Sequence, residues 1–342
     1  MAEGQVLDEG VEFEEHRRYL SSVAYRLLGS LADAEDAVQD AWLRWQSADR
    51  STVRDARAYL TTVVTRICYD LLGSARARRE AYYGEWLPEP LVAGRPGGEA
   101  LGTGGATLAE NPEERVTLGE SVSYAMLAVM EQLSPAERAA FVLHDVFAVG
   151  FEEVAEALGR TPEAVRQLAS RARRRVKERA AQHAADGVDS VDGVGGAEKA
   201  YRIDKVNRAE HRKAVAAFAA AAVGGDIPGL MAVLDPEVVW HSDGGGVVRA
   251  GLRPVFTADR VARLVAGFTE RWIGSPEVGL NFEQVDVNGE PGLLALDGAG
   301  AVMAVFAFEV VDGRITETYA VINPEKLARS VGLEVSAHLP RL

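Results

Sequence analysis

The sequence predicts a multidomain protein in which two all-α helical domains precede an α+β domain. Three observations support this prediction. Apolar residues recur with helical spacing over a first helical block, residues 12–79, and a second helical block, residues 111–180. A Gly- and Pro-rich segment without periodicity separates the blocks, and short apolar runs punctuated by Asn-Gly and Asp-Gly pairs follow them. We therefore expect domains at 1–82, 111–180 and 208–342, with linkers at 83–110 and 181–207.

The overall charge restricts any contact with nucleic acid to local patches. The 342 residues include 37 Lys and Arg against 51 Asp and Glu, a formal net charge of -14, which repels a polyphosphate except where basic side chains gather. The single cysteine, Cys68, excludes an internal disulfide and has apolar neighbours, so we expect a buried thiol in a reducing compartment. No leader or membrane-spanning run is evident, and we expect a cytoplasmic protein that does not contact membranes.

The first helical block predicts three helices. The apolar spacing that begins at Glu12 is interrupted by Gly29 and Ser30. A polar turn over residues 47–52 precedes a third helix over about 55–72, and the segment 54–79 is rich in arginine, which makes a local positive patch. The second helix, over 33–45, lies between the interruption at Gly29 and Ser30 and the polar turn. It turns one polar stripe outward, made of Asp33, Asp36, Gln39, Asp40 and Arg44.

The second helical block ends in a helix-turn-helix pattern. Asn111 and Ser134 are each followed by a proline and then by a glutamate at the third position, which predicts two helix starts. Residues 151–158 form one apolar stripe, Gly159 ends that helix, and Thr161 caps the next. The last helix buries Val165, Leu168, Ala169, Ala172 and Val176 and turns outward Arg166, Gln167, Ser170, Arg171, Arg173, Arg174 and Lys177.

A basic helix after a tight turn fits the major groove of DNA. The alternative is an ordinary amphipathic hairpin with a solvated charged face. We favour DNA binding, because this face carries many arginines and almost no acid within an acidic chain.

Two blocks of the sequence resemble bacterial RNA polymerase sigma factors of the extracytoplasmic-function group. They are DAEDAVQDAWLRW with the following RAYLTTVVTRICYDLLGSARARR, and the later helix-turn-helix. The resemblance implies sigma region 2 for residues 1–82 and sigma region 4 for 111–180. It also implies binding to the β′ clamp and β flap of core RNA polymerase, and promoter-specific initiation of transcription.

The resemblance assigns roles to three sets of residues. Contacts with the polymerase fall on Asp33, Asp36, Gln39, Asp40 and Arg44. Reading and opening of the −10 element fall on Ser47, Asp49, Arg50, Ser51, Arg57, Tyr59, Thr62 and Arg66, although Tyr59 fits the core equally well. Reading of the −35 element falls on Arg166, Gln167, Ser170 and Arg171, with Arg173 and Arg174 nearer the phosphates. Basic side chains would hold the backbone, Arg and Gln would pair with base edges, and a flipped base would be trapped in a pocket.

The last third of the chain predicts an α+β cone with a curved sheet. Helical patterns at 208–223 and 261–272 accompany strand patterns at 238–241, 280–287, 293–297, 302–311 and 314–322. This part resembles the SnoaL-like polyketide cyclases of the nuclear transport factor fold. The whole chain is similar to sigma factors that carry such a domain, the sigma J type, on three signatures: WLPEP at 86–90, DGGG at 243–246 and NPEKL at 323–327.

The signatures imply a regulatory contact between the first linker and the C-terminal domain. Its residues would be Trp86, Leu87, Pro88, Asp243, Gly244, Gly245, Gly246, Asn323, Pro324 and Lys326. A lysine usually follows the triple glycine in this subgroup, whereas Val247 stands here, and Arg249 is a candidate replacement. We expect the domain to modulate activity in cis, without a separate anti-sigma factor.

Enzymatic activity is the main alternative for the C-terminal domain, because Trp240, His241 and Asp243 are expected at the mouth of the cone. No clear acid–base pair is present, so we expect a non-catalytic domain with no cofactor and no metal, and we leave open a small-molecule ligand in the cone. For the whole chain, the alternative is a helix-turn-helix regulator that is not a sigma factor. That alternative leaves the acidic helix unexplained.

Overall fold

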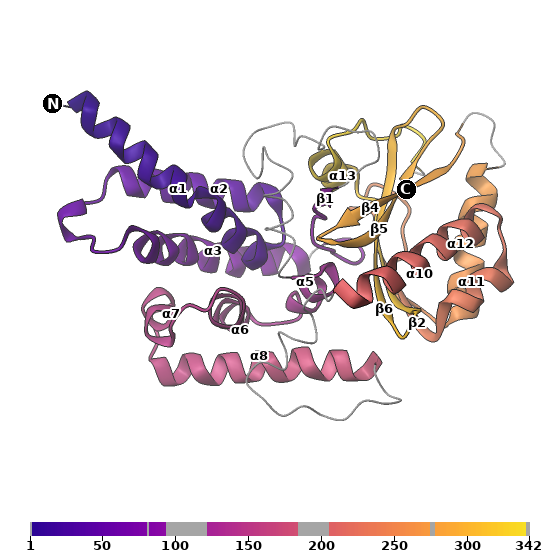
Figure 1. Cartoon of the computed structure of the whole chain (residues 1–342), viewed down its shortest axis with the longest axis horizontal. Coiled ribbons are helices and arrows are strands. Elements are labelled where there is room, and N and C mark those ends of the chain that lie inside the picture. The colour runs from indigo at the N-terminus through magenta and orange to yellow at the C-terminus, as the bar shows by residue number, and fades with distance from the viewer. Residues whose placement is uncertain (1, 81, 94–121, 184–204, 274–277, 340–342) are drawn as a thin grey trace. The chain divides into compact units, whose positions relative to one another are not determined.

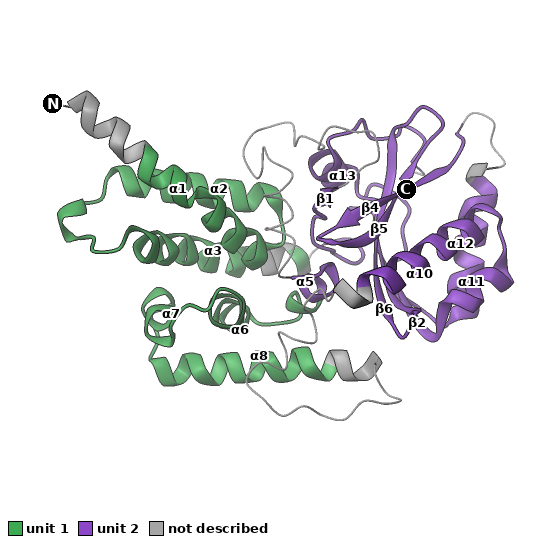
Figure 2. Cartoon of the chain, viewed as in Figure 1, with its two compact units in different colours: residues 1–80, 129–180, 191–200 green, residues 81–128, 181–190, 201–342 purple. Residues whose placement is uncertain are grey.

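The computed structural model describes residues 2–80, 82–93, 122–183, 205–273 and 278–339 (Figure 1). They form two compact units (Figure 2). The first unit holds the described residues up to 80 together with 129–180, and the second holds 82–93, 122–128 and the described residues from 205 onward. Among the described helices, none combines the length and apolar character needed to span a membrane.

The first helical block forms α1 (Ala2–Leu28), α2 (Leu31–Gln46), the 3-10 turn η1 (Arg50–Thr52) and α3 (Ala56–Glu80). The predicted interruption is confirmed, because Gly29 is left-handed and the Ser30 side chain accepts a hydrogen bond from the Asp33 amide to start α2. Trp45, Leu60 and Cys68 are buried in the core of this block. Burial raises the pKa of the Cys68 thiol far above its ordinary value, so the predicted buried thiol is confirmed.

The second helical block forms α5 (Tyr124–Met130), α6 (Pro135–Phe141), η2 (Val142–Val146), α7 (Phe151–Leu158) and α8 (Pro162–His183). The predicted capping box at Ser134 and Glu137 is present. Gly159 ends α7 in the left-handed conformation with φ of 61°, and the Thr161 hydroxyl accepts a hydrogen bond from the Ala164 amide at 3.3 Å. The helix start predicted at Asn111 lies outside the described residues.

Within the first unit the two helical blocks pack directly on each other. The ring of Tyr19 on α1 meets the ring of Phe147 at a centroid distance of 5.4 Å. Buried Arg138 on α6 donates a hydrogen bond to the Arg26 carbonyl oxygen at 3.2 Å. The carboxylate of Glu131, which lies between α5 and α6, pairs with both Arg138 and Arg79 of α3. Ionic and aromatic contacts therefore hold the two blocks in one closed arrangement.

The second unit is built on a seven-stranded mixed sheet with the order β1-β4-β5-β6-β7-β2-β3. All neighbours are antiparallel except β2 and β7, which run parallel. Asn288-Gly289 and Asp312-Gly313 have positive φ angles and form the predicted hairpin turns. The strands are β1 (Val92–Ala93), β2 (Leu234–Asp243), β3 (Val255–Phe256), β4 (Asn281–Val287), β5 (Glu290–Leu296), β6 (Val302–Val311) and β7 (Arg314–Val321).

Helices complete the second unit and confirm the predicted α+β class (Figure 1). They are α10 (Lys205–Val223), α11 (Ile227–Val233), α12 (Ala258–Ile273) and α13 (Pro324–Val331). Trp240, Phe306 and Ala320 line a cavity together with residues of α10 and α12, so these helices cover one face of the sheet. Because side chains alternate along a strand, His241 and Asp243 of β2 point to the opposite face, toward α13 and residues 82–93.

A pH-dependent contribution to stability is expected at Glu290, the first residue of β5. Burial raises its pKa to about 8, the Glu309 carboxylate adds to the increase, and Arg208 opposes it. A carboxyl whose pKa is higher in the folded state favours folding fully below its unfolded pKa, and this contribution is lost as the pH rises through 8. We expect Glu290→Gln to raise the melting temperature at pH 9 by on the order of 3 °C and much less at pH 5. Thermal unfolding followed by circular dichroism checks this, with exposed Glu270→Gln as the control; an equal shift at both pH values would contradict it.

Candidate functional site

The basic face of α8 is largely exposed between Arg166 and Lys177. Val165, Ala169, Ala172 and Val176 are fully buried on one side of the helix, as predicted, while Leu168 is half-buried. A helix buried at this spacing leaves its other side in water. That exposed side carries Arg166, Gln167, Ser170, Arg171, Arg174 and Lys177.

The arginines of α8 differ in what they already contact. Arg173 is only partly exposed, and its Nε lies 2.5 Å from the Asp145 carboxylate of η2. Arg166 lies 3.2 Å from Glu152 of α7, but both side chains are exposed, so this pair is weak. Gln167, Ser170 and Arg171 make no side-chain hydrogen bond or ion pair with the described residues. Their polar groups are therefore available to a partner.

The loop before α3 is held by its own side chains. Asp49 accepts hydrogen bonds from the Ser51 amide at 3.1 Å and the Ser51 hydroxyl at 2.7 Å, and the Ser47 hydroxyl donates to the Arg44 carbonyl oxygen at 3.0 Å. The Arg50 guanidinium lies 4.5 Å from the ring of Trp45, within range of a cation–π contact. These contacts thus hold the loop in one conformation with polar side chains on its surface.

The predicted residues of α3 are partly engaged by other elements. The Arg57 guanidinium lies 4.2 Å from the ring of Tyr19, and half-buried Tyr59 lies 5.7 Å from Trp45, so both side chains contribute to packing. Thr62 is half-buried nearby. Arg66 is exposed, and its guanidinium donates a hydrogen bond to the Glu156 carbonyl oxygen of α7 at 3.0 Å. In the closed arrangement, α7 of the second helical block therefore forms a hydrogen bond with the Arg66 side chain.

The polar stripe of α2 is exposed, with Asp33 half-buried and Asp36, Gln39, Asp40 and Arg44 in solvent. Leu43 lies on the same side and is 56% exposed, which is high for a large apolar residue. Sequence reasoning missed Leu43. Its position seven residues after Asp36 and three after Asp40 is the signal that could have placed it on this face.

The C-terminal domain binds residues 82–87, where the first linker begins, around a fully buried carboxylate, Asp243. This carboxylate accepts hydrogen bonds from the Tyr82 hydroxyl at 2.7 Å and the Leu87 amide at 3.0 Å, and it pairs with the Lys326 ammonium at 2.6 Å. Burial and the Asp243 charge raise the pKa of the Tyr82 phenol above its usual value, which keeps it a hydrogen-bond donor. We call Tyr82, Leu87, Asp243 and Lys326 the linker latch.

Lys326 supplies the positive charge of the linker latch. Its side chain is 6% exposed and also donates to the Leu87 carbonyl oxygen. The ammonium lies 4.0 Å from the centroid of the Trp86 ring, a cation–π contact in a desolvated site. The ammonium therefore comes from the NPEKL segment. Val247, which follows the triple glycine, is exposed to solvent.

The DGGG and NPEKL segments shape the latch. Gly245 has a φ of 70° and donates its amide to Asp243 at 3.0 Å, and a Cβ there would lie 2.6 Å from the Asn323 side chain. Asn323 caps α13, with Pro324 at the first position, and donates its amide to the Tyr82 hydroxyl at 2.9 Å. Gly244 and Gly246 complete the turn.

Two further contacts were missed by sequence reasoning. Glu85 lies 2.6 Å from Nδ1 of His241, and the Tyr124 hydroxyl donates to the Pro88 carbonyl oxygen at 2.6 Å. Tyr124 is buried and packs 5.4 Å from the ring of Tyr319 on β7. Glu85 flanks the WLPEP motif, which is a usable signal, but nothing in the sequence connects Tyr124 to it.

The expectation that Trp240, His241 and Asp243 share the mouth of the cone is wrong for the last two. Trp240 lines the cavity between the sheet and its helices. His241 and Asp243 contact the linker on the other face of β2. Alternation of side chains along the strand separates them. Within the described residues, no group of histidine, cysteine and acidic side chains could hold a metal ion.

Comparison with known proteins places these sites in a family. Residues 13–78 match Sigma-70 region 2, and residues 123–176 match Sigma-70, region 4. The chain is 39% identical over 325 residues to the ECF RNA polymerase sigma factor SigJ of Mycobacterium tuberculosis, covering 93% of each chain. It is 33% identical to the probable ECF sigma factor SigI of the same organism, over 91% of this chain and 92% of that one. The crystal structure of M. tuberculosis SigJ matches 94% of this chain and 98% of its own, with a TM-score of 0.67 and 35% identity.

Proposed function

Because the chain belongs to the extracytoplasmic-function RNA polymerase sigma factors, which direct transcription initiation, we propose that its C-terminal domain modulates this activity in cis. The domain would do so by holding the segment that connects the first and second helical blocks, which we call the promoter-reading blocks. No separate anti-sigma factor would then be needed.

Anchoring of the connecting segment at both ends is the observation that carries this proposal. Tyr82, two residues after α3 ends at Glu80, is bound to Asp243, and β1 pairs with β4 through Val92 and Val287. At the other end, Tyr124 lies in the same hydrophobic core as the sheet. A tether fixed at both ends cannot use its full length, so the domain would limit how far the two blocks separate.

The closed packing of the first unit supports the same proposal. Arg66, which we propose contacts the −10 element with Ser47, Asp49, Arg50, Ser51, Arg57, Tyr59 and Thr62, is bonded to α7 in this arrangement. The guanidinium keeps other N–H donors, but α7 beside it would restrict how a DNA duplex approaches this side chain. Promoter binding would therefore require the blocks to part, and the latch would oppose this separation.

We propose that α8 reads the −35 element in the major groove. Arg166, Gln167, Ser170 and Arg171 would face the bases, because they are exposed along one side of the helix. Arg174 would contact phosphate, whereas the ion pair of Arg173 with Asp145 favours a supporting role. On α2, the exposed stripe with Leu43 at its edge would contact the β′ clamp of the polymerase, and the helix-turn-helix block would contact the β flap.

The base-reading role of α8 predicts different behaviour for two arginines. Arg171→Ala is expected to weaken binding to a −35 duplex by about 10- to 100-fold, and to weaken binding to a scrambled duplex much less. Arg174→Ala should weaken both duplexes similarly and reduce the salt dependence by about one phosphate contact. Fluorescence anisotropy over a salt series measures both. Equal losses on the two duplexes for Arg171→Ala would remove the base-reading role.

Truncation tests the regulatory proposal. A chain ended after about Arg179 keeps both promoter-reading blocks and loses the domain that anchors the connecting segment. In run-off transcription with purified core polymerase, we expect the same start site and a changed amount of transcript. An unchanged amount would eliminate modulation in cis while leaving the sigma-factor activity intact.

A further inference from the structure

The first unit contains a polar cavity where its two helical blocks meet, which we call the junction cavity. It has a volume of about 280 Å³ and lies between the second half of α3 and the turn that joins α5 to α6. Arg79 of α3, Arg138 of α6 and Glu131 of the turn supply its charged side chains. A cavity of roughly 150 Å³ accepts benzene in another protein, so the junction cavity has room for a small organic molecule.

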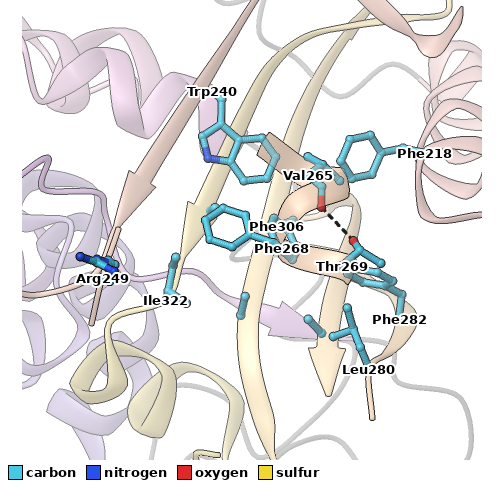
Figure 3. A pocket seen from close by; sticks show the side chains of 13 residues that line it. Phe218, Trp240, Arg249, Val265, Phe268, Thr269, Leu280, Phe282, Phe306 and Ile322 are labelled. Atoms are coloured by element: carbon cyan, nitrogen blue, oxygen red, sulfur yellow. Dashed lines mark hydrogen bonds between the residues drawn. The ribbon is translucent and has the colours of Figure 1, made fainter. Parts of the chain in front are cut away.

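A cavity in the C-terminal domain, between the sheet and its helices, offers different chemistry (Figure 3). The described side chains that line it, such as Phe218, Trp240 and Phe306, present only apolar surface, and its volume is about 40 Å³. A charged ligand would lose its hydration there without gaining a partner. The junction cavity combines charged and apolar walls and is therefore the stronger candidate for a ligand site.

The lining of the junction cavity carries an excess of positive charge. Each oxygen of the Glu131 carboxylate pairs with one guanidinium, Oε2 with Arg79 and Oε1 with Arg138. Within the lining, two cations therefore share one carboxylate. A buried charge without full compensation destabilises its surroundings, and a second anion in the cavity would reduce this penalty.

Arg138 has hydrogen-bonding capacity that the described residues leave unused. Its Nε donates to the Arg26 carbonyl oxygen at 3.2 Å and its Nη1 donates to Glu131, whereas its Nη2 is buried and has no acceptor among the described residues. A guanidinium presents five N–H donors in a planar fork, which suits an oxyanion with several acceptor oxygens. Because Arg138 lines the cavity, an oxyanion that enters can satisfy this group once the guanidinium turns toward it.

We propose that the junction cavity binds a small phosphate monoester. Its phosphoryl group has three terminal oxygens, so it accepts hydrogen bonds from both Arg79 and Arg138 while the existing ion pairs remain. Its organic group packs against an apolar wall made by Leu72, Leu133 and Pro135. The volume of about 280 Å³ limits this group to a short chain or a single ring.

The position of the junction cavity gives the ligand an effect on the packing of the two blocks. Arg79 belongs to α3 of the first helical block and Arg138 to α6 of the second, so a ligand held by both favours the closed arrangement. Such a ligand would reduce transcription, a consequence that rests on the proposed function above. Binding itself does not depend on that function.

Calorimetric titration of the full chain with phenyl phosphate, inorganic phosphate and phenol tests the proposal. Phenyl phosphate is expected to bind saturably and about fivefold or more tightly than inorganic phosphate, because its ring adds buried apolar surface. Phenol, which lacks the charge, should bind about tenfold or more weakly than phenyl phosphate. Run-off transcription is measured separately, so that a ligand that binds without changing transcription contradicts only the effect on regulation.

Variants of the charged residues identify the site. Arg79→Gln removes one guanidinium and is expected to weaken phenyl phosphate by about tenfold or more, while leaving phenol within about twofold. Glu131→Gln removes the competing carboxylate, so phenyl phosphate should raise the melting temperature of this variant more than that of the wild type. The matched control is Arg54→Gln, which changes an exposed arginine of the same unit outside the cavity lining and should alter neither affinity.

Two results would overturn the proposal. One is a wild-type chain that shows no saturable binding of phenyl phosphate at millimolar concentrations. The other is a loss of affinity in Arg54→Gln as large as in Arg79→Gln, which would show attraction to positive surface charge and not to this cavity. Melting temperatures without ligand identify any variant that fails to fold. If Arg79→Gln does not fold, Glu131→Gln decides, because an equal or smaller increase in its melting temperature than in the wild type contradicts a site on these guanidiniums.

Discussion

Replacing Lys326 by methionine is expected to lower the free energy of unfolding of the second unit by about 3–5 kcal/mol. The substitution preserves an apolar stem of similar length but leaves the fully buried Asp243 carboxylate without its ion-pair partner. The remaining donors, the Tyr82 hydroxyl and the Leu87 amide, are neutral and cannot replace a positive charge at 2.6 Å. The linker should lose its attachment at the same time.

Urea unfolding followed by circular dichroism measures the stability, and proteolysis near residue 86 reports release of the linker. Lys213→Met is the matched control, because Lys213 is an exposed lysine of α10 with no ion pair among the described residues. Adding Asp243→Asn to Lys326→Met should recover part of the loss, since the double variant buries no unpaired charge. Strictly additive losses would show that the two groups do not depend on each other.

Replacing Glu131 by glutamine is expected to lower the free energy of unfolding of the first unit by about 2–4 kcal/mol. Glu131 pairs with both Arg79 and Arg138, and Arg138 is buried with a side-chain exposure of 2%. A glutamine amide can accept from one guanidinium but carries no charge, so a buried cation loses its compensation. These pairs join α3 to the helix-turn-helix block, so the closed packing of the two blocks should weaken as well.

Spin labels placed on exposed positions of α2 and α8 can follow that packing by their distance distribution. We expect a broader and longer distribution for Glu131→Gln than for the wild type. Glu153→Gln, which changes an exposed glutamate of α7 with no ion pair among the described residues, should leave the distribution unaltered. A variant with reduced stability but an unaltered distribution would mean that Glu131 supports its own block only.

Local chemistry explains which parts of the fold could be predicted from the sequence. Helix ends at Ser30, Ser134 and Gly159 were predictable, because a capping side chain or a left-handed glycine acts within a few residues. The short strands β1 and β3 were not predicted, since two residues carry no periodicity. The parallel pairing of β2 with β7 was not predicted either, because it joins the start of the domain to its end.

The same reasoning applies to the sites. The exposed face of α8 follows from helical spacing alone, and the WLPEP, DGGG and NPEKL segments were identified through a family resemblance. What escaped prediction is the way these segments meet. Tyr82 and Asp243 are separated by 161 residues, and Glu85 and His241 by 156. Contacts over such separations depend on the assembled sheet, and no local pattern encodes them.

Run-off transcription with purified core polymerase and graded latch variants tests the central claim most directly. Tyr82→Phe removes one hydrogen bond to Asp243, and Lys326→Met removes the charge; Tyr83→Phe alters a neighbouring tyrosine that is 56% exposed. If the C-terminal domain restrains the promoter-reading blocks, transcript from the same start site should increase from wild type to Tyr82→Phe to Lys326→Met, with Tyr83→Phe equal to wild type. Equal or smaller amounts of transcript from both latch variants, when both still bind the polymerase, would contradict the restraint.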